Sequence, residues 1–123
     1  MSKPIVHWEF WSKEPSKVSD FYSKVFDWKI QHIPEMDYRM VEASGEGGLT
    51  GGIMTPKDGP WPGNMSFYID VDSLAVYRKK IVEAGGKIIV EEMEIPGMGK
   101  LSMFQDPDER IIGIWEKLAQ AGK

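Results

Sequence analysis

The feature that most constrains the fold is a repeated order of elements on either side of a short segment rich in proline and glycine. This segment, residues 57–64 (KDGPWPGN), is the best candidate for a linker, because proline and glycine interrupt regular structure. On each side of it the apolar pattern indicates a strand, an amphipathic helix and three further strands. One such half alone would expose a face of its sheet, so the halves must cover each other or the same halves of a second chain. We therefore predict an α+β fold of two βαβββ modules whose mixed sheets form curled half-barrels around a cavity.

The two modules together make up a single domain over residues 1–123. Module one spans residues 4–56, module two spans residues 65–116, and residues 117–123 form a polar tail that we expect to fray. The length is that of one ordinary domain and suffices for a packed core. The expected strands cover residues 4–11, 28–33, 38–43, 49–54, 65–71, 87–95, 100–105 and 110–116.

The first predicted helix begins at Pro15, since proline fits the first helical position. Its apolar residues recur with helical spacing, and we expect them to be buried. Asp27 follows, and aspartate tolerates the left-handed conformation that often ends a helix. The buried stripe consists of Val18, Phe21, Tyr22, Val25 and Phe26.

The second predicted helix has its own start and stop signals. Asp72 is a plausible N-cap, and Gly85 with Gly86 is typical of a left-handed C-terminal cap. Its expected buried stripe consists of Leu74, Tyr77, Ile81 and Ala84.

The first strand brings potential chemistry to one face of a sheet. Side chains alternate along a strand, so His7, Glu9 and Trp11 project to the same side. A potential metal ligand, a potential base and a large aromatic ring therefore lie together. The opposite face carries Val6, Trp8 and Phe10, and should pack beneath the first helix.

Composition and charge exclude several classes of protein. Lysine and arginine number 15 against 19 aspartate and glutamate residues, and the basic residues are scattered, so nucleic acid is not an expected partner. No apolar run approaches the ~20 residues that span a bilayer, and the N-terminus shows no targeting segment. The chain has no cysteine, which excludes disulfides, thiolate metal sites and a cysteine nucleophile. We expect a cytoplasmic protein that does not bind membranes.

Several short motifs, taken in order, carry a resemblance to a known family. They are the histidine in the opening strand, Phe21-Tyr22 in the first helix, the Phe-Asp-Trp of residues 26–28, the Ala-Gly-Gly-Lys of residues 84–87 and the Asp-Pro-Asp of residues 106–108. Between about Ile5 and Glu116 the chain resembles the vicinal oxygen chelate superfamily, the group of glyoxalases, bleomycin-resistance proteins and extradiol dioxygenases. The resemblance implies a homodimer or an equivalent pairing of modules, with a ligand site inside each curled sheet.

Metal-dependent members of this superfamily hold a divalent cation with four side chains, typically histidine and glutamate, from four strands. Carried over to this chain, the first position falls on His7, which is retained. The position on the fourth strand falls near Gly51 or Gly52, the one opening module two on Ser66, and the one on the last strand on Gly113. Glycine offers no side-chain donor and a serine hydroxyl is a poor ligand. We expect no metal and no other cofactor, with His7 as the one surviving candidate ligand.

Alternation also predicts the walls of a small-molecule site. Tyr68 shares a face with Ser66, and Trp115 shares a face with Gly113. An aromatic and thioether lining with few polar anchors is typical of such sites, although the same residues would equally fill a fully packed interior. Trp61 in the linker and Met98 in a turn are candidates for a lid. The predicted ligand-binding residues are His7, Glu9, Trp11, Met54, Ser66, Tyr68, Met103 and Trp115.

Three functional hypotheses follow, and the sequence does not name a substrate for any of them. The first is a glyoxalase/bleomycin-resistance-like protein that binds a small organic molecule without a metal. The second is a lyase, isomerase or dioxygenase-type enzyme with Glu9 as catalytic base and His7 as a polar or metal anchor. The third is an interaction module whose dimer surface is its function. We also predict a homodimer, because the outer strands of the modules need partners.

Overall fold

The computed structural model describes residues 2–43, 45, 48–56 and 63–118. Within these ranges the chain forms two compact units, one of residues 6–67 and one of residues 68–123 together with 1–5. We call them the 6–67 unit and the 68–123 unit. The linker prediction over residues 57–64 lies largely outside the described residues, and so does most of the predicted tail. No helix in the described ranges is both long enough and apolar enough to cross a membrane.

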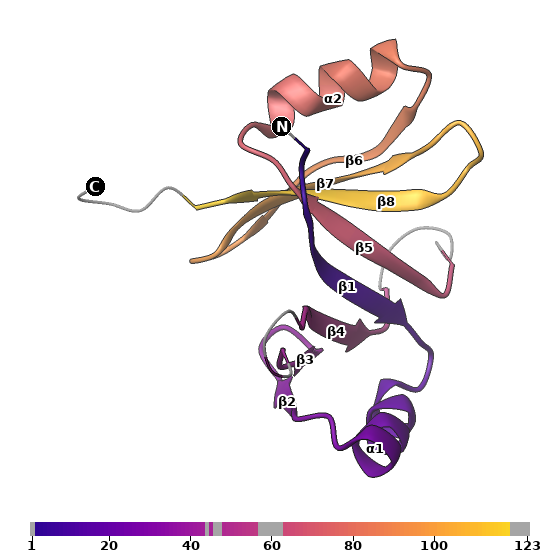
Figure 1. Ribbon diagram of the computed structural model, residues 1–123, viewed down its shortest axis with the longest axis vertical. Helices are drawn as coiled ribbons and strands as arrows, with labels where there is room; N and C mark the ends of the chain where they lie inside the picture. Colours follow the sequence, from indigo (N-terminus) through magenta and orange to yellow (C-terminus); the bar gives the residue numbers. More distant parts are fainter. Residues whose placement is uncertain (1, 44, 46–47, 57–62, 119–123) are drawn as a thin grey trace. The chain divides into compact units, whose positions relative to one another are not determined.

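The 6–67 unit contains one helix and the four strands of the first βαβββ series (Figure 1). Its strands follow the order β2-β3-β4-β1, with β1 parallel to β4 and the other neighbours antiparallel. The sheet is therefore mixed, as the sequence predicts. The elements are β1 (Ile5–Trp11), α1 (Pro15–Phe26), β2 (Ile30–Ile33), β3 (Tyr38–Val41) and β4 (Thr50–Met54).

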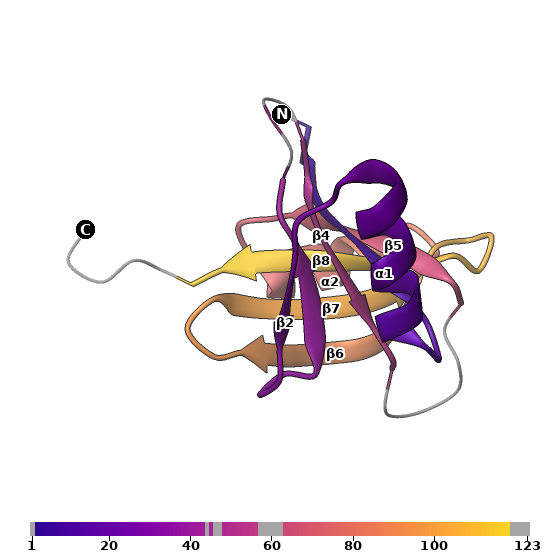
Figure 2. The ribbon, with the colours of Figure 1, turned by 90° about the horizontal axis from the view of Figure 1, so that it is seen from below.

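The 68–123 unit repeats this arrangement with longer strands. Its strand order is β5-β8-β7-β6, with β5 parallel to β8 and the others antiparallel. Figure 2 shows β8, β7 and β6 running side by side, and α2 packs on these three strands. The elements are β5 (Met65–Asp70), α2 (Leu74–Glu83), β6 (Lys87–Ile95), β7 (Gly99–Gln105) and β8 (Ile111–Lys117), so that β5 begins in the 6–67 unit.

The helix ends follow local chemistry. Asp27 has φ 59° and ψ 30°, which confirms the left-handed cap of α1. At the end of α2, the Gly86 amide donates to the Ile81 carbonyl and the Gly85 amide to the Val82 carbonyl, the pair of bonds that defines a Schellman cap. Gly85 takes φ 101°, a conformation that favours glycine.

The start of α2 corrects one prediction by a single residue. The N-cap is Ser73 and not Asp72, because the Val76 amide donates to the Ser73 hydroxyl at 3.2 Å. The Leu74 amide is satisfied separately, by a carboxylate oxygen of Glu116 at 2.8 Å. Both acceptors reach α2 at its positive end, where free amides need partners.

The stripe predicted for α2 is largely confirmed. Leu74 is buried in a core with Val71 and Ile114, and Tyr77 and Ile81 pack against that core. Ala84 is exposed, since it already lies beyond the last helical residue.

The stripe predicted for α1 is wrong in part. Tyr22 packs on Phe10 of β1, with ring centroids 5.5 Å apart, which confirms that this face of β1 lies beneath the helix. Phe21, Val25 and Phe26, however, are each more than half exposed. The helix is apolar on two sides, and the sheet of its own unit covers one of them.

The N-cap of α2 gives a test of this local account. Ser73→Ala removes the acceptor for the Val76 amide and should lower the free energy of unfolding by about 1 kcal/mol. Ser16→Ala, at an exposed position inside α1, is the matched control and should change it by less than ~0.5 kcal/mol. Urea unfolding followed by circular dichroism measures both variants, and equal effects would contradict the capping role.

Candidate functional site

Two of the three side chains predicted to share a face of β1, those of Glu9 and Trp11, are buried and hydrogen-bonded to each other. Glu9 is only 5% exposed, and Trp11 is 7% exposed. The Trp11 indole Nε1 donates to Glu9 Oε1 at 2.8 Å. The second carboxylate oxygen, Oε2, accepts a hydrogen bond from the Tyr38 hydroxyl of β3 at 2.7 Å. A carboxylate that accepts two such bonds can be buried at tolerable cost.

His7 extends this group toward the surface. Its Nε2 lies 2.8 Å from the Tyr38 hydroxyl, and its Nδ1 lies 2.7 Å from the hydroxyl of Thr50, an exposed residue of β4. Burial lowers the pKa of His7 from 6.5 to about 4, because desolvation disfavours the charged imidazolium. The ring is therefore neutral at pH 7, with one nitrogen that donates and one that accepts.

Glycine at position 52 makes room for this arrangement. A Cβ atom built on Gly52 would lie 1.6 Å from the Tyr38 hydroxyl oxygen, so no larger residue fits without a shift of the phenol. Gly52 is the register partner of both Glu9 on β1 and Met40 on β3. Tyr38 therefore fills the space above Gly52, one of the two glycines near which the resemblance implies a ligand position on the fourth strand.

The adjacent Gly51 accommodates a different ring. A Cβ there would lie 2.0 Å from the indole of Trp8, which belongs to the opposite face of β1. Trp8 packs in turn on Phe10 and Trp28. The two glycines of β4 thus leave room for two aromatic side chains, one on each face of the sheet.

The 68–123 unit repeats this combination of ring and glycine on its last strand. Tyr68 of β5 is the register partner of Gly113 on β8, and a Cβ on Gly113 would lie 2.1 Å from the Tyr68 ring. Met103 of β7 pairs with Gly113 from the other side and is buried. Trp115 lies half-buried two residues along β8, close to Gly99. The 68–123 unit therefore contains Tyr68, Met103 and Trp115, whereas the 6–67 unit contains Glu9 and Trp11.

The other predicted residues differ in their exposure. Met54 is half-buried at the end of β4, where it pairs with Trp11. Ser66 is 3% exposed, and its hydroxyl makes a long 3.4 Å bond to the Phe67 carbonyl. Of the two lid candidates, Met98 is exposed in the turn between β6 and β7, whereas Trp61 lies outside the described residues.

The donor set of the 6–67 unit does not fit the divalent metal site of the superfamily. His7 and Glu9 are both hydrogen-bonded to the Tyr38 hydroxyl, which fills the space above Gly52. In the described ranges, no three histidine, aspartate or glutamate side chains come together in a way that could hold an ion. A neutral hydroxyl is a weak ligand compared with imidazole or carboxylate.

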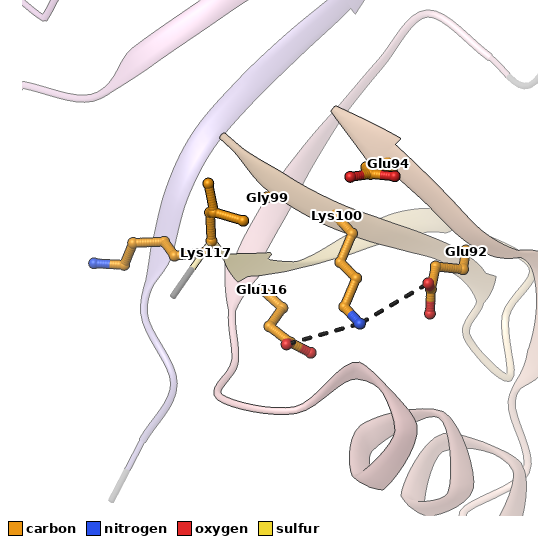
Figure 3. Close-up of a pocket in the computed structure, with 7 residues that line it drawn as sticks. Glu92, Glu94, Gly99, Lys100, Glu116 and Lys117 are labelled. Atoms are coloured by element: carbon orange, nitrogen blue, oxygen red, sulfur yellow. Dashed lines mark ion pairs between the residues drawn. The ribbon is translucent and has the colours of Figure 1, made fainter. Parts of the chain in front are cut away.

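A surface cavity of about 310 Å³ lies elsewhere, between the ends of β6, β7 and β8 (Figure 3). Lys100 stands between Glu92 and Glu116, with an ion pair of 3.9 Å to each. Lys100 thus offsets part of the charge of the glutamates that line the cavity, and none of the predicted site residues lines it. We regard it as a feature of the strand ends and not as the functional site.

Sequence reasoning missed Tyr38 and Thr50, the two residues that link His7 to Glu9. A signal for Tyr38 was present in the paired glycines of β4, which predict the close approach of another group. What the sequence lacked was the register of β3 against β4, because a slip of one residue would turn Tyr38 to the other face. The contact of Thr50 with His7 follows only from the register of β4 against β1, which the sequence does not show.

A family model, the Glyoxalase/Bleomycin resistance protein/Dioxygenase superfamily, matches residues 5–114. The chain belongs to this superfamily. The paired βαβββ series and the position of His7 in the opening strand agree with that membership, and they confirm the resemblance seen in the sequence. Family membership defines the fold but leaves the reaction open.

A curated relative is an anthracycline biosynthesis protein, DnrV, of Streptomyces peucetius. It is 25% identical over 126 aligned residues, which cover 90% of this chain and 46% of the relative. The chain therefore spans less than half the length of this relative.

Solved structures show the same fold. A glyoxalase/bleomycin resistance protein/dioxygenase superfamily member from Vibrio splendidus has a TM-score of 0.68 at 14% identity, with 94% of this chain and 100% of the other covered. A methylmalonyl-CoA epimerase from Mycobacterium tuberculosis has a TM-score of 0.66 at 13% identity, with 94% and 88% covered. One further epimerase of this fold was solved with methylmalonyl-CoA bound. Members of the superfamily thus bind small molecules.

The lowered pKa of His7 predicts how stability changes with pH. Between pH 6.5 and about 4, the unfolded chain protonates this histidine while the folded protein does not, so acidification favours unfolding. The loss is at most about 3 kcal/mol, and the partial exposure of the ring reduces it. His7→Gln should flatten this part of the curve of unfolding free energy against pH.

His32→Gln is the matched control, because His32 is the other histidine of the chain and lies exposed on β2. The control variant should keep the wild-type slope. If the two variants change the slope equally, the neutral state assigned to buried His7 is wrong.

Proposed function

We propose that this protein binds a small organic molecule without a metal ion, on the face of the 6–67 unit that carries His7, Glu9 and Trp11. Large aromatic surfaces combined with a few fixed polar groups are typical of small-molecule sites. Trp11 and Tyr38 supply the rings, and Met54 lies beside Trp11 on β4. Half-buried His7 and exposed Thr50 supply polar groups that a ligand can reach.

The observation that carries the proposal is the position of the Tyr38 hydroxyl. It bonds to Glu9 and His7 together and fills the space above Gly52. The side chains that would otherwise hold a cation are thus joined into a hydrogen-bonded network. In the 68–123 unit, Tyr68 above Gly113 fills the position on the last strand in the same way.

For the remaining predicted residues, the proposal is that Ser66 contacts a ligand on the 6–67 unit, and that Tyr68, Met103 and Trp115 contact a ligand on the 68–123 unit. Their support is the sequence pattern and the register of Tyr68, Gly113 and Met103 across three neighbouring strands. The enzyme hypothesis, with Glu9 as base, has less support, since both oxygens of Glu9 already accept hydrogen bonds from Trp11 and Tyr38. A base must reach the proton it abstracts.

Trp11 provides a direct test of ligand binding. Screening a library of neutral and charged aromatic compounds by tryptophan fluorescence should yield compounds that quench the wild-type protein. Trp11→Phe should reduce the affinity for these compounds by about tenfold or more, because it removes ring area and the bond to Glu9. Trp28→Phe is the matched control, since Trp28 packs with Trp8 and Tyr22 on the other face.

The same titrations repeated with EDTA should give unchanged affinities. Loss of binding on removal of divalent ions, restored by adding zinc or manganese, would contradict a site without metal. Quenching that depends on Trp28 and not on Trp11 would place the ligand elsewhere.

We also propose that the protein is a homodimer, and that it is cytoplasmic, as its cysteine-free sequence predicts. The support for a dimer is the exposed apolar side of α1, formed by Phe21, Val25 and Phe26, and the outer strands of each sheet. Light scattering at micromolar concentration should return about twice the chain mass of 14.0 kDa. A monomeric mass at all concentrations would contradict the dimer.

A further inference from the structure

A continuous run of hydrogen bonds joins exposed Thr50 to buried Glu9. The links are Thr50 Oγ1 to His7 Nδ1 at 2.7 Å, His7 Nε2 to Tyr38 Oη at 2.8 Å, and Tyr38 Oη to Glu9 Oε2 at 2.7 Å. Each is short, and each inner member of the run can both donate and accept. All four residues belong to the 6–67 unit.

The hydrogens of this run have two consistent arrangements. In the first, Thr50 donates to Nδ1, the Nε2–H of His7 donates to Tyr38, and Tyr38 donates to ionised Glu9. In the second, protonated Glu9 donates to Tyr38, Tyr38 donates to Nε2, and the Nδ1–H of His7 donates to Thr50. The Thr50 hydroxyl then has the Val6 carbonyl, 3.5 Å away, or solvent as its acceptor.

We propose that Thr50, His7, Tyr38 and Glu9 form a proton relay through which the buried carboxylate gains or loses one proton without movement of heavy atoms. On uptake, Thr50 passes its hydrogen to Nδ1 and takes one from solvent. The Nε2–H bond breaks as the Tyr38 oxygen takes that hydrogen, and the former Tyr38 hydrogen moves to Glu9 Oε2. His7 and Tyr38 are neutral before and after, and the net change is one proton on Glu9.

The surroundings of Glu9 suit such a relay. Two titratable groups belong to the run that ends at Glu9, His7 from its own strand and Tyr38 from β3, while β4 brings Thr50 and Gly52. Residues 65–67 of β5, Met-Ser-Phe, carry no titratable group. Arg39 alternates to the other face from Tyr38, and Lys13 beyond β1 is exposed. The lowered pKa of His7 keeps its ring neutral at pH 7, so that it can donate and accept together.

The relay has a consequence for the proposed function. A ligand that accepts a hydrogen bond from the exposed Thr50 hydroxyl favours the protonated arrangement, because in the ionised arrangement the Thr50 hydrogen is donated to His7 Nδ1. Binding is then coupled to the exchange of one proton. This consequence rests on the proposed function, but the relay itself does not require a ligand.

Glu9→Gln tests the relay without a ligand, because it should reverse the direction in which each hydrogen bond of the run is donated. The Trp11 Nε1–H points at the Oε1 position, so the amide oxygen of the glutamine must lie there and its NH₂ group must face Tyr38. The NH₂ group donates to Tyr38, Tyr38 then donates to His7 Nε2, and His7 must carry its hydrogen on Nδ1. The substitution keeps the shape of the side chain and its two hydrogen bonds.

The imidazole ¹⁵N chemical shifts, measured by NMR at pH 7, report the tautomer directly. The wild type should show the Nε2–H form and Glu9→Gln the Nδ1–H form, a change of at least about tenfold in the tautomer ratio. His32 is an internal reference, and Glu42→Gln, at an exposed position after β3, is a control that should leave His7 unchanged. The same His7 tautomer in wild type and Glu9→Gln overturns the relay.

Tyr38→Phe tests the same run independently, and it covers the case in which Glu9→Gln does not fold. Removing the phenol oxygen removes the acceptor that selects the Nε2–H form of His7, so the share of that tautomer should fall. An unchanged pure Nε2–H form in Tyr38→Phe overturns the relay. Because these shifts are measured on the protein alone, failure of the relay is distinguishable from failure of ligand binding.

Discussion

The burial of the Glu9 carboxylate is the constraint on which the rest of the 6–67 unit depends. A carboxylate taken out of water loses several kcal/mol of hydration unless hydrogen bonds replace it. Trp11 and Tyr38 supply these bonds from β1 and β3. The phenol reaches Glu9 only because Gly52 has no side chain. One buried charge thus explains a tryptophan, a tyrosine and a glycine on three neighbouring strands.

Rings packed on strand glycines recur in both units. Tyr38 lies on Gly52 of β4 and Tyr68 on Gly113 of β8. A strand glycine weakens a sheet unless a neighbouring ring covers it. In both units of this superfamily fold, aromatic packing thus fills the space beside a strand glycine.

The sequence predicted most of the fold and part of the site. Period-two alternation placed His7, Glu9 and Trp11 on one face. The predicted bounds of β6 agree with the structure at both ends, because glycine-containing turns flank this strand on either side. The partners of His7 were missed, because Tyr38 and Thr50 are brought to it by strand register, which depends on pairing across the sheet. The exposure of Phe21 and Phe26 was missed for a related reason: a helix with two apolar sides does not reveal which side its own sheet covers.

We propose that the face around Glu9 binds an organic molecule without a metal. An electron-density map of protein purified without a His tag and without additives, with anomalous data collected above the zinc edge, tests this proposal. We expect Glu9 to be bonded to Trp11 and Tyr38, and any bound density on this face to be that of an organic molecule. An anomalous peak within coordination distance of His7 and Glu9, with Tyr38 displaced from both, would contradict it.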